Sequence, residues 1–146
     1  MKRLISIVLC IFILLLCCNC TIKESETMET TCDRTVTVIN GIKEADIWIL
    51  PKTEENLKTT LWGKAVASKV KENESRQVPL SKPGDDGLYI FRMIDNDHMY
   101  YSAEDLILED GWTLEIKGEL MADVIIEVTD KDGAVKVAYE VSAARL

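Results

Sequence analysis

The chain has 146 residues, with 25 acidic and 17 basic side chains and a formal net charge of −8 at pH 7. Nucleic acids and anionic lipid surfaces attract cationic proteins, so this charge argues against both as binding partners. The length predicts one domain, large enough to bury most of the surface that its unfolded chain exposes.

The N-terminus has the layout of an export signal. Lys2 and Arg3 precede an uncharged and mostly apolar run from Leu4 to Cys18, and a polar stretch follows. A secretory signal has an apolar core of roughly 7–15 residues, whereas a transmembrane helix needs about 20. We therefore expect residues 1–19 to be a signal peptide, with an uncleaved anchor as the alternative. Either way, the positive end stays in the cytoplasm and the rest of the chain is exported.

Cysteines gather at the end of this run. The segment Leu15-Leu16-Cys17-Cys18-Asn19-Cys20 resembles the lipobox of bacterial lipoproteins, in which a Leu stands three or four positions before the Cys that is acylated. The resemblance implies a lipid anchor, palmitate included, on Cys20 (alternatively Cys18), and a place in the cell envelope. An ordinary signal peptide is the other interpretation. Only Cys32 follows Cys20, so no disulfide framework is expected.

A tether and a folded domain are expected after the signal. Residues 20–33 contain no aromatic side chain and few large apolar ones, which is typical of a flexible linker. The domain should span residues 34–146.

The domain begins with two short predicted strands. Arg34–Asn40 alternates strictly, with Val36 and Val38 on one face. Asn40-Gly41 predicts a turn, because both residues tolerate a positive φ. Ile47–Leu50 predicts a second strand, which the following proline ends.

The stretch Thr53–Ala67 predicts one or two helical turns. Thr53 could cap them, and Leu57 and Leu61 belong to an apolar repeat of spacing four, which Gly63 interrupts.

The rest of the chain predicts further short strands separated by loops and turns rich in Asp, Asn and Gly. These strands are Arg76–Leu80, Leu88–Asp95, Met99–Ser102, Leu106–Leu108, Trp112–Lys117, Ala122–Thr129 and Ala134–Val141, the last two forming a hairpin. Seven to nine strands without βαβ alternation predict an all-β fold. We expect an antiparallel β-sandwich, immunoglobulin- or transthyretin-like, with an open β-barrel as the alternative.

The stretch from Val36 to Ile116 resembles small exported bacterial β modules of no assigned activity. The matching residues are Val38-Ile39-Asn40-Gly41, Ile47-Trp48-Ile49, Trp62-Gly63 and Arg92-Met93-Ile94-Asp95-Asn96-Asp97 followed by Tyr100. His98 departs from the pattern, where a Gly is usual. The resemblance implies a sandwich and no reaction.

His98 is the single histidine, and it lies in a predicted turn beside Asp95 and Asp97. We expect an exposed turn histidine. The alternative is a small metal-dependent hydrolase that uses these three residues. Against that alternative, the chain has no second histidine to complete a zinc site and no nucleophile motif.

Asp130 and Asp132 are spaced like the first ligands of a calcium loop, but the later acidic ligands are missing. Turn chemistry is the expected role of these residues, since Asp and Gly favour turns for backbone reasons.

Three tryptophans could form a binding platform if two of them lay exposed together. Trp48 and Trp112 lie in apolar strands and are expected in the core. Trp62, between a polar stretch and Gly63, is the weak candidate for a binding residue.

The sequence therefore predicts a non-enzymatic envelope lipoprotein that serves as a binding or structural module and needs no cofactor. Its partners would be the membrane, through the anchor, and an envelope protein, but no nucleic acid. The alternative function is an acidic inhibitor or capture protein for a cationic partner such as a lysozyme.

Overall fold

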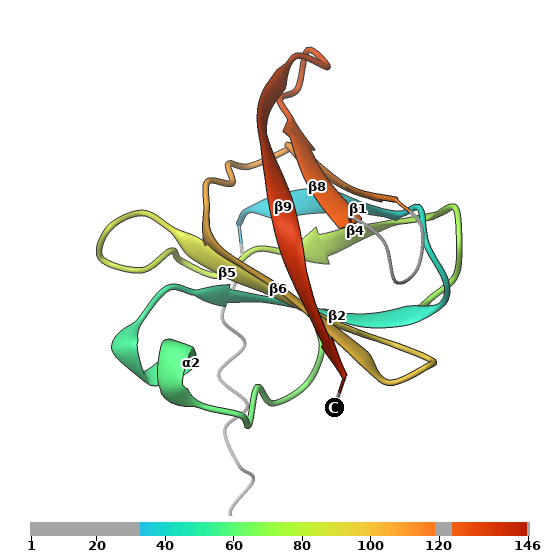
Figure 1. The fold of residues 1–146 in the computed structure, drawn as a ribbon. Helices are drawn as coiled ribbons and strands as arrows, with labels where there is room; N and C mark the ends of the chain where they lie inside the picture. The colour runs from blue at the N-terminus through green and yellow to red at the C-terminus, as the bar shows by residue number, and fades with distance from the viewer. Residues whose placement is uncertain (1–32, 119–123, 146) are drawn as a thin grey trace, which may run out of the picture. The chain divides into compact units, whose positions relative to one another are not determined.

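Nine strands and one short helix form the part of the chain that the computed structural model describes, residues 33–118 and 124–145 (Figure 1). In chain order they are β1 (Thr35–Asn40), β2 (Ala45–Pro51), α2 (Glu54–Lys58), β3 (Ala67–Val70), β4 (Glu74–Pro79), β5 (Tyr89–Asp95), β6 (Met99–Leu106), β7 (Thr113–Lys117), β8 (Val124–Thr129) and β9 (Val135–Arg145). The predicted all-β class is confirmed.

Strand β9 belongs to two sheets and joins them. Sheet A has the strand order β9-β8-β7-β1-β4, and sheet B has the order β3-β2-β5-β6-β9. Strand β9 pairs with β8 along residues 135–141 and with β6 along residues 142–145. Neighbouring strands are antiparallel except β1 and β7, which are parallel. The predicted antiparallel β-sandwich is confirmed, and the described strands do not close into a barrel because β3 and β4 are not paired with each other.

The core lies between the two sheets and follows the period of two along the strands. Val36 and Val38 of β1 are fully buried, as the alternation predicts. Strand β5 contributes Tyr89, Phe91 and Met93, also fully buried. Burying one large apolar side chain stabilises a fold by about 1.5–3 kcal/mol. Such burial must hold the domain together, since no disulfide is expected in it.

The predicted helical turns are confined to α2. The Thr53 side chain caps this helix by accepting a hydrogen bond from the backbone N–H of Asn56 at 3.1 Å. The helix ends at Lys58, although the apolar repeat continues beyond it. The following chain crosses sheet B, where Trp62 rather than Leu61 turns inward.

The turn at Asn40-Gly41 leads from sheet A to sheet B and does not join two neighbouring strands. Gly41 has no positive φ, so that part of the prediction is wrong. A Cβ at Gly41 would lie 2.4 Å from the carbonyl oxygen of Ile116, to which the Gly41 N–H donates at 2.8 Å. Glycine is therefore required here for a close approach to β7.

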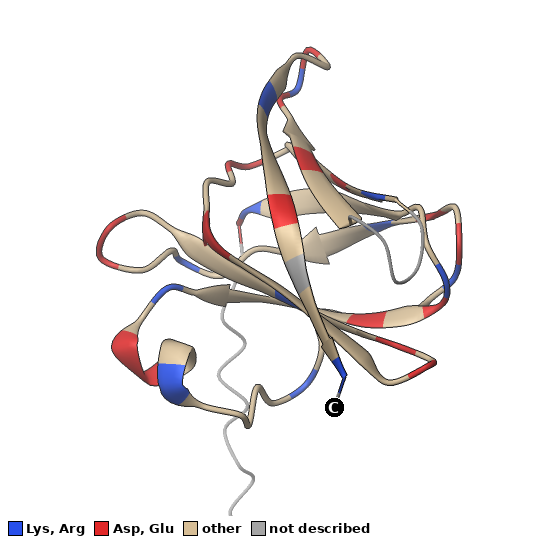
Figure 2. Cartoon of the chain, viewed as in Figure 1, with Lys and Arg blue, Asp and Glu red and all other residues tan. Residues whose placement is uncertain are grey.

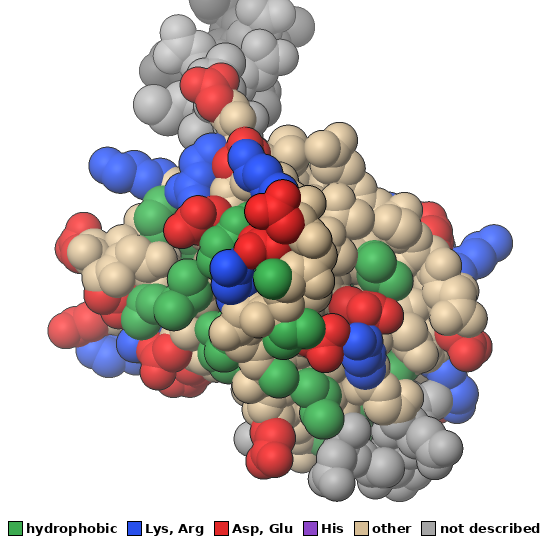
Figure 3. Space-filling model, turned by 90° about the horizontal axis from the view of Figure 1, so that it is seen from above, with side chains coloured by type: hydrophobic (Ala, Val, Ile, Leu, Met, Phe, Trp, Pro, Cys, Tyr) green, Lys and Arg blue, Asp and Glu red, His purple; other side chains and the backbone are tan. Residues whose placement is uncertain are grey.

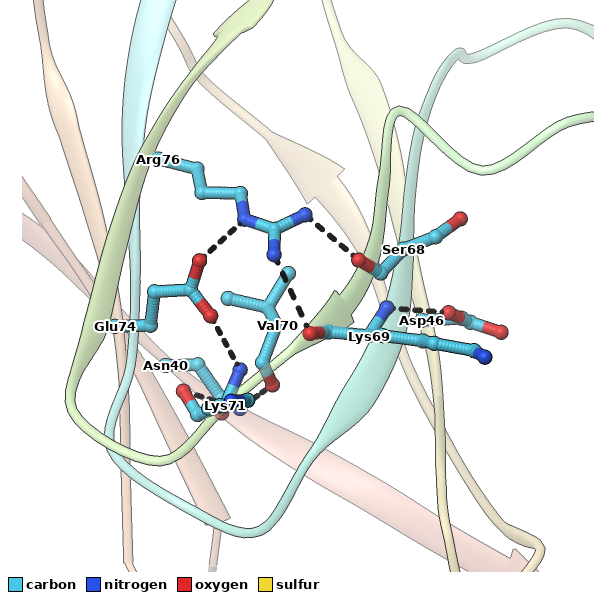
Figure 4. A network of polar contacts seen from close by, with 8 residues as sticks. All are labelled: Asn40, Asp46, Ser68, Lys69, Val70, Lys71, Glu74 and Arg76. Atoms are coloured by element: carbon cyan, nitrogen blue, oxygen red, sulfur yellow. Dashed lines mark hydrogen bonds and ion pairs between the residues drawn. The ribbon is translucent and has the colours of Figure 1, made fainter.

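The guanidinium of Arg76 connects the two edge strands, β4 of sheet A and β3 of sheet B, which are not paired with each other (Figure 4). From β4 it donates to the carbonyl oxygens of Ser68 (2.7 Å) and Lys69 (3.3 Å) in β3, and its Nε donates to Glu74 at 2.7 Å. Close to it, the fully buried Asn40 side chain donates to the last carbonyl of β3 at 2.8 Å. Side chains thus take the place of a backbone ladder between the two edges.

Candidate functional site

The outer face of sheet B, which is turned away from sheet A, is covered by the chain that follows β2 (Figure 1). We call residues 52–66 the covering segment. Ile90 is fully buried although it alternates along β5 with the core residues Tyr89 and Phe91, and therefore points outward. The domain thus has a smaller packed region outside its main core.

Four side chains from four elements meet on this outer face and form what we call the aromatic cluster. They are Trp48 of β2, Trp62 of the covering segment, Arg92 of β5 and Tyr100 of β6. The ring centroids of Trp48 and Trp62 are 5.4 Å apart at an interplanar angle of 70°, and Trp62 stacks on Tyr100 at 5.2 Å and 23°. The register of sheet B places two members of the cluster side by side, because Trp48 is the cross-strand partner of Arg92.

Arg92 is a buried cation, with only 8% of its surface exposed. Its guanidinium carbon lies 5.2 Å from the ring centroid of Trp62 and 5.7 Å from that of Tyr100, whose hydroxyl accepts a hydrogen bond from it. No carboxylate of the described residues lies within 4.0 Å of it, and its Nε has no hydrogen-bond partner there. Burial lowers the pKa of Arg92, and the charge of Glu104 opposes this shift. The rings stabilise the charge, since a desolvated cation–π contact contributes about 2 kcal/mol.

Both indole N–H groups of the cluster are used within the covering segment. Trp48 Nε1 donates to the carbonyl of Gly63 at 3.1 Å, and Trp62 Nε1 donates to the carbonyl of Thr59 at 2.9 Å. These two bonds fix how the rings lie. A ligand could therefore contact the apolar surface of the two indole rings, but it could not accept a hydrogen bond from their N–H groups.

A shallow depression lies beside the cluster, and most of its lining is apolar. Its lining residues are Trp48, Thr60, Leu61, Trp62, Gly63 and Ile94. Leu61 is 87% exposed, which makes it the most exposed large hydrophobic side chain in the described part of the chain. Apart from the indole groups, only Thr60 brings a polar side chain. The depression can therefore bury an apolar group but offers few hydrogen bonds.

The three tryptophans have different places. Trp62, the predicted weak candidate, lies in the aromatic cluster. The expectation that Trp48 lies in the core is wrong, because Ile47 and Ile49 are the core residues of β2 and Trp48 alternates with them. Trp112 packs against the core, as expected.

Sequence reasoning did not select Arg92 or Leu61 as site residues. For Arg92 a signal was available, since it is a lone cation inside the apolar strand 88–94. For Leu61 the sequence gives no such signal, because Leu61 lies four residues after Leu57 and this spacing predicts the apolar face of a helix.

Asp95 is the last residue of β5, directly before the turn to β6, and its side chain is buried. The residue is 3% exposed, and its Oδ1 accepts hydrogen bonds from the backbone N–H groups of Asp97 and Met99, both at 2.9 Å. Its Oδ2 accepts from the Tyr101 hydroxyl at 3.1 Å. Burial raises the pKa of Tyr101 to about 12, with help from Asp95. Asp95 therefore serves to hold this turn.

The other two residues of the hydrolase alternative point elsewhere. Asp97 forms an ion pair with Lys43 at 2.7 Å, and this hydrogen bond raises the pKa of Lys43. His98 is exposed, has a φ of +61° and makes no side-chain hydrogen bond to a described residue. Asp95, Asp97 and His98 are close in sequence, but they do not form a group that could hold a metal ion.

The hairpin turn between β8 and β9 uses Asp130 in the same way. Asp130 accepts from the backbone N–H groups of Asp132 and Ala134, both at 2.9 Å, and pairs with Lys136 at 2.7 Å. The hydrogen bond from Lys136 is the largest cause that lowers the pKa of Asp130. Within residues 33–118 and 124–145, no group of three His, Cys, Asp or Glu residues is arranged to hold a metal ion.

The predicted lipid-attachment residues Cys18 and Cys20, Cys32 and all of the predicted tether except Asp33 lie outside the described residues. In the ranges that the structure describes, no helix has the length and apolar character needed to cross a membrane.

Comparison of the chain with protein-family models, with curated proteins and with solved structures gave no match in any of the three.

Proposed function

We propose that this chain is a non-enzymatic binding protein of the bacterial cell envelope, anchored to a membrane by lipid on Cys20 or Cys18. The resemblance of residues 15–20 to a lipobox supports the anchor. One observation carries the binding role: Leu61 is 87% exposed beside two tryptophan rings whose orientation is fixed by hydrogen bonds. An exposed apolar patch on a rigid support is typical of an interaction site.

The partner that fits this depression is a protein that inserts an apolar side chain. A sugar would need several hydrogen-bonding groups, but both indole N–H groups already donate to backbone carbonyls and only Thr60 is left. Burying Leu61 against a partner would contribute about 1.5–3 kcal/mol. Aromatic side chains such as Trp48 and Trp62 are also the residue types that most often dominate interface energies.

A second function, the capture of a cationic protein such as a lysozyme, is supported by the net charge of −8. Opposite charge accelerates association, and this effect weakens as salt is added. The two proposals therefore differ in one measurable property. Binding at Leu61 should survive about 0.5 M salt, whereas electrostatic capture should not.

We do not propose the metal-dependent hydrolase. Both carboxylate oxygens of Asp95 accept hydrogen bonds, from the turn and from Tyr101 of β6, and Asp97 is paired with Lys43. His98 forms no hydrogen bond or ion pair with either carboxylate. Replacing His98 and Asp97 with Ala should leave metal content and hydrolase screens unchanged.

The anchor is tested by intact-mass analysis of the membrane fraction. We expect a mature N-terminus at Cys20 or Cys18 that carries the added mass of acyl chains. A chain that still begins at Met1 would refute the lipoprotein proposal.

The binding role is tested by photo-crosslinking in intact cells. A photoreactive amino acid replaces Leu61 in one variant and Val135 in a control, which is also exposed (56%) but lies on the β8–β9 hairpin. We expect a discrete crosslinked protein from position 61 and none from position 135. Equal products at both positions, or none at position 61, would contradict the proposal.

A further inference from the structure

Strands β6 and β9 form a notch where sheet B gives way to sheet A. The two strands are paired along Met99–Ser102 and Ser142–Arg145, and beyond this point they diverge because β9 turns to pair with β8 (Figure 1). The hollow between them is lined by Ser102, Ala103, Glu104, Ala138, Tyr139 and Glu140.

Each wall of this notch is a strand edge with a neighbour on one side only. Residues 138–140 pair with β8, and residue 103 pairs with β5, while no described strand pairs with either on the notch side. Tyr139 closes one end, where its hydroxyl accepts from the Ile107 N–H at 3.0 Å and donates to the Asp105 carbonyl at 3.2 Å. In an antiparallel strand half of the backbone groups point to each side, so the edges leave donors and acceptors free for an added strand.

The notch is also negatively charged. Glu104 and Glu140 are exposed, one on each wall, and neither forms an ion pair with another described residue. Figure 2 shows acidic residues on β9 and at the end of β6. Seen from above in Figure 3, the end of the domain with the β8–β9 hairpin mixes hydrophobic, acidic and basic side chains, so no broad field of one sign covers it. The negative charge of the notch is therefore a local feature that favours a cation.

We propose that the notch binds an extended segment of a protein partner that carries Lys or Arg. The segment pairs through its backbone with the free edge of β9 at residues 138–140, as in other cases of strand addition. Its cationic side chains meet Glu104 and Glu140, and this charge complementarity selects the occupant. The site is separate from the depression around Leu61 and does not depend on the function proposed above.

The test uses the isotope-labelled full-length protein in a neutral detergent and an alternating peptide of Lys and Val with blocked ends. We expect the largest NMR shifts at the backbone amides of residues 103–104 and 138–140. A peptide in which Glu replaces Lys should not bind. A peptide with a central Pro, which cannot donate a ladder hydrogen bond, should bind at least about fivefold more weakly.

Matched variants distinguish binding in the notch from nonspecific electrostatic attraction to the acidic protein. The double variant Glu104→Gln and Glu140→Gln should weaken binding of the Lys–Val peptide about tenfold at about 50 mM salt. The control Glu55→Gln and Glu72→Gln removes the same charge at two exposed residues elsewhere and should weaken it less than about twofold. Leu61→Asp should leave peptide binding intact, so failure of the depression and failure of the notch can be distinguished. Equal losses in the two double variants, shifts outside the notch, or equal binding of the Pro peptide would overturn the proposal.

Discussion

Replacing Asp95 should destabilise the domain, because its carboxylate holds the turn between β5 and β6. Asp95→Ala removes the acceptor of three hydrogen bonds, two from backbone N–H groups at 2.9 Å and one from the buried Tyr101 hydroxyl at 3.1 Å. Each hydrogen bond to a charged group contributes about 1.5–3 kcal/mol, but water can reach the two N–H groups, so we expect a total loss of about 3–5 kcal/mol. Asp95→Asn keeps one acceptor oxygen and should cost about 1–2 kcal/mol.

Denaturant unfolding at pH 7, followed by tryptophan fluorescence, measures both losses. A native domain of this size is stable by about 5–15 kcal/mol, so the difference between the two variants is easily resolved. The Tyr101 pKa gives a second readout. It should fall in Asp95→Asn but stay above 10, because burial is the largest cause of its rise and remains in place. An Asp95→Ala variant within about 0.5 kcal/mol of the wild type would refute the structural role of Asp95 and revive a chemical one.

Three further predictions concern the loop before β5, the bridge between the sheet edges and the response to alkali. Gly84→Ala should cost more stability than Gly87→Ala in the same loop: a Cβ at Gly84 would meet a backbone oxygen at 2.0 Å, whereas Gly87 has open space and only a φ of +79°. We expect Gly84→Ala to lower the free energy of unfolding by about 3 kcal/mol or more and Gly87→Ala to lower it by about 1–2 kcal/mol, measured by thermal unfolding. Equal losses would argue against the close approach at Gly84. Arg76→Met should expose the β3 edge, cost about 1–2 kcal/mol and speed amide exchange in residues 67–70, and unchanged exchange there would argue against the bridge. Stability should fall by about 2 kcal/mol in total from pH 10 to pH 12, because the unfolded chain releases the Tyr101 proton near pH 10 while the folded domain keeps it to about pH 12. A flat profile over this range, measured by denaturant unfolding, would contradict the burial of that hydroxyl.

The strands with regular alternation could be predicted from the sequence, because a period of two depends only on which residues face the core. Strand β1 and the β8–β9 hairpin are examples. Strand β3 could not be found in this way: its residues Ser68 and Lys69 are exposed, so only pairing with β2 makes it a strand. The passage of the chain from sheet A to sheet B at Gly41 could not be predicted either, because a local turn pattern does not show which strands the turn connects.

The candidate site was predicted in part. Trp62 stood out because it interrupts a polar stretch, but the place of Trp48 depends on a covering segment that lies over sheet B. An apolar run such as Ile47–Leu50 does not tell whether one face or both are covered. Arg92 is stabilised by the rings of Trp62 and Tyr100, which come from two other elements. A local sequence pattern cannot show such long-range contacts.

Because β9 belongs to both sheets, neither sheet can be completed until this strand is available. It follows all other described strands in the chain, and its first part completes sheet A while its last part completes sheet B. During synthesis, which proceeds from the N-terminus, the earlier strands therefore have unpaired edges until β9 emerges. Contacts between segments so far apart form slowly. Cooperative folding of the whole domain therefore becomes possible only when residues 135–145 have been synthesised.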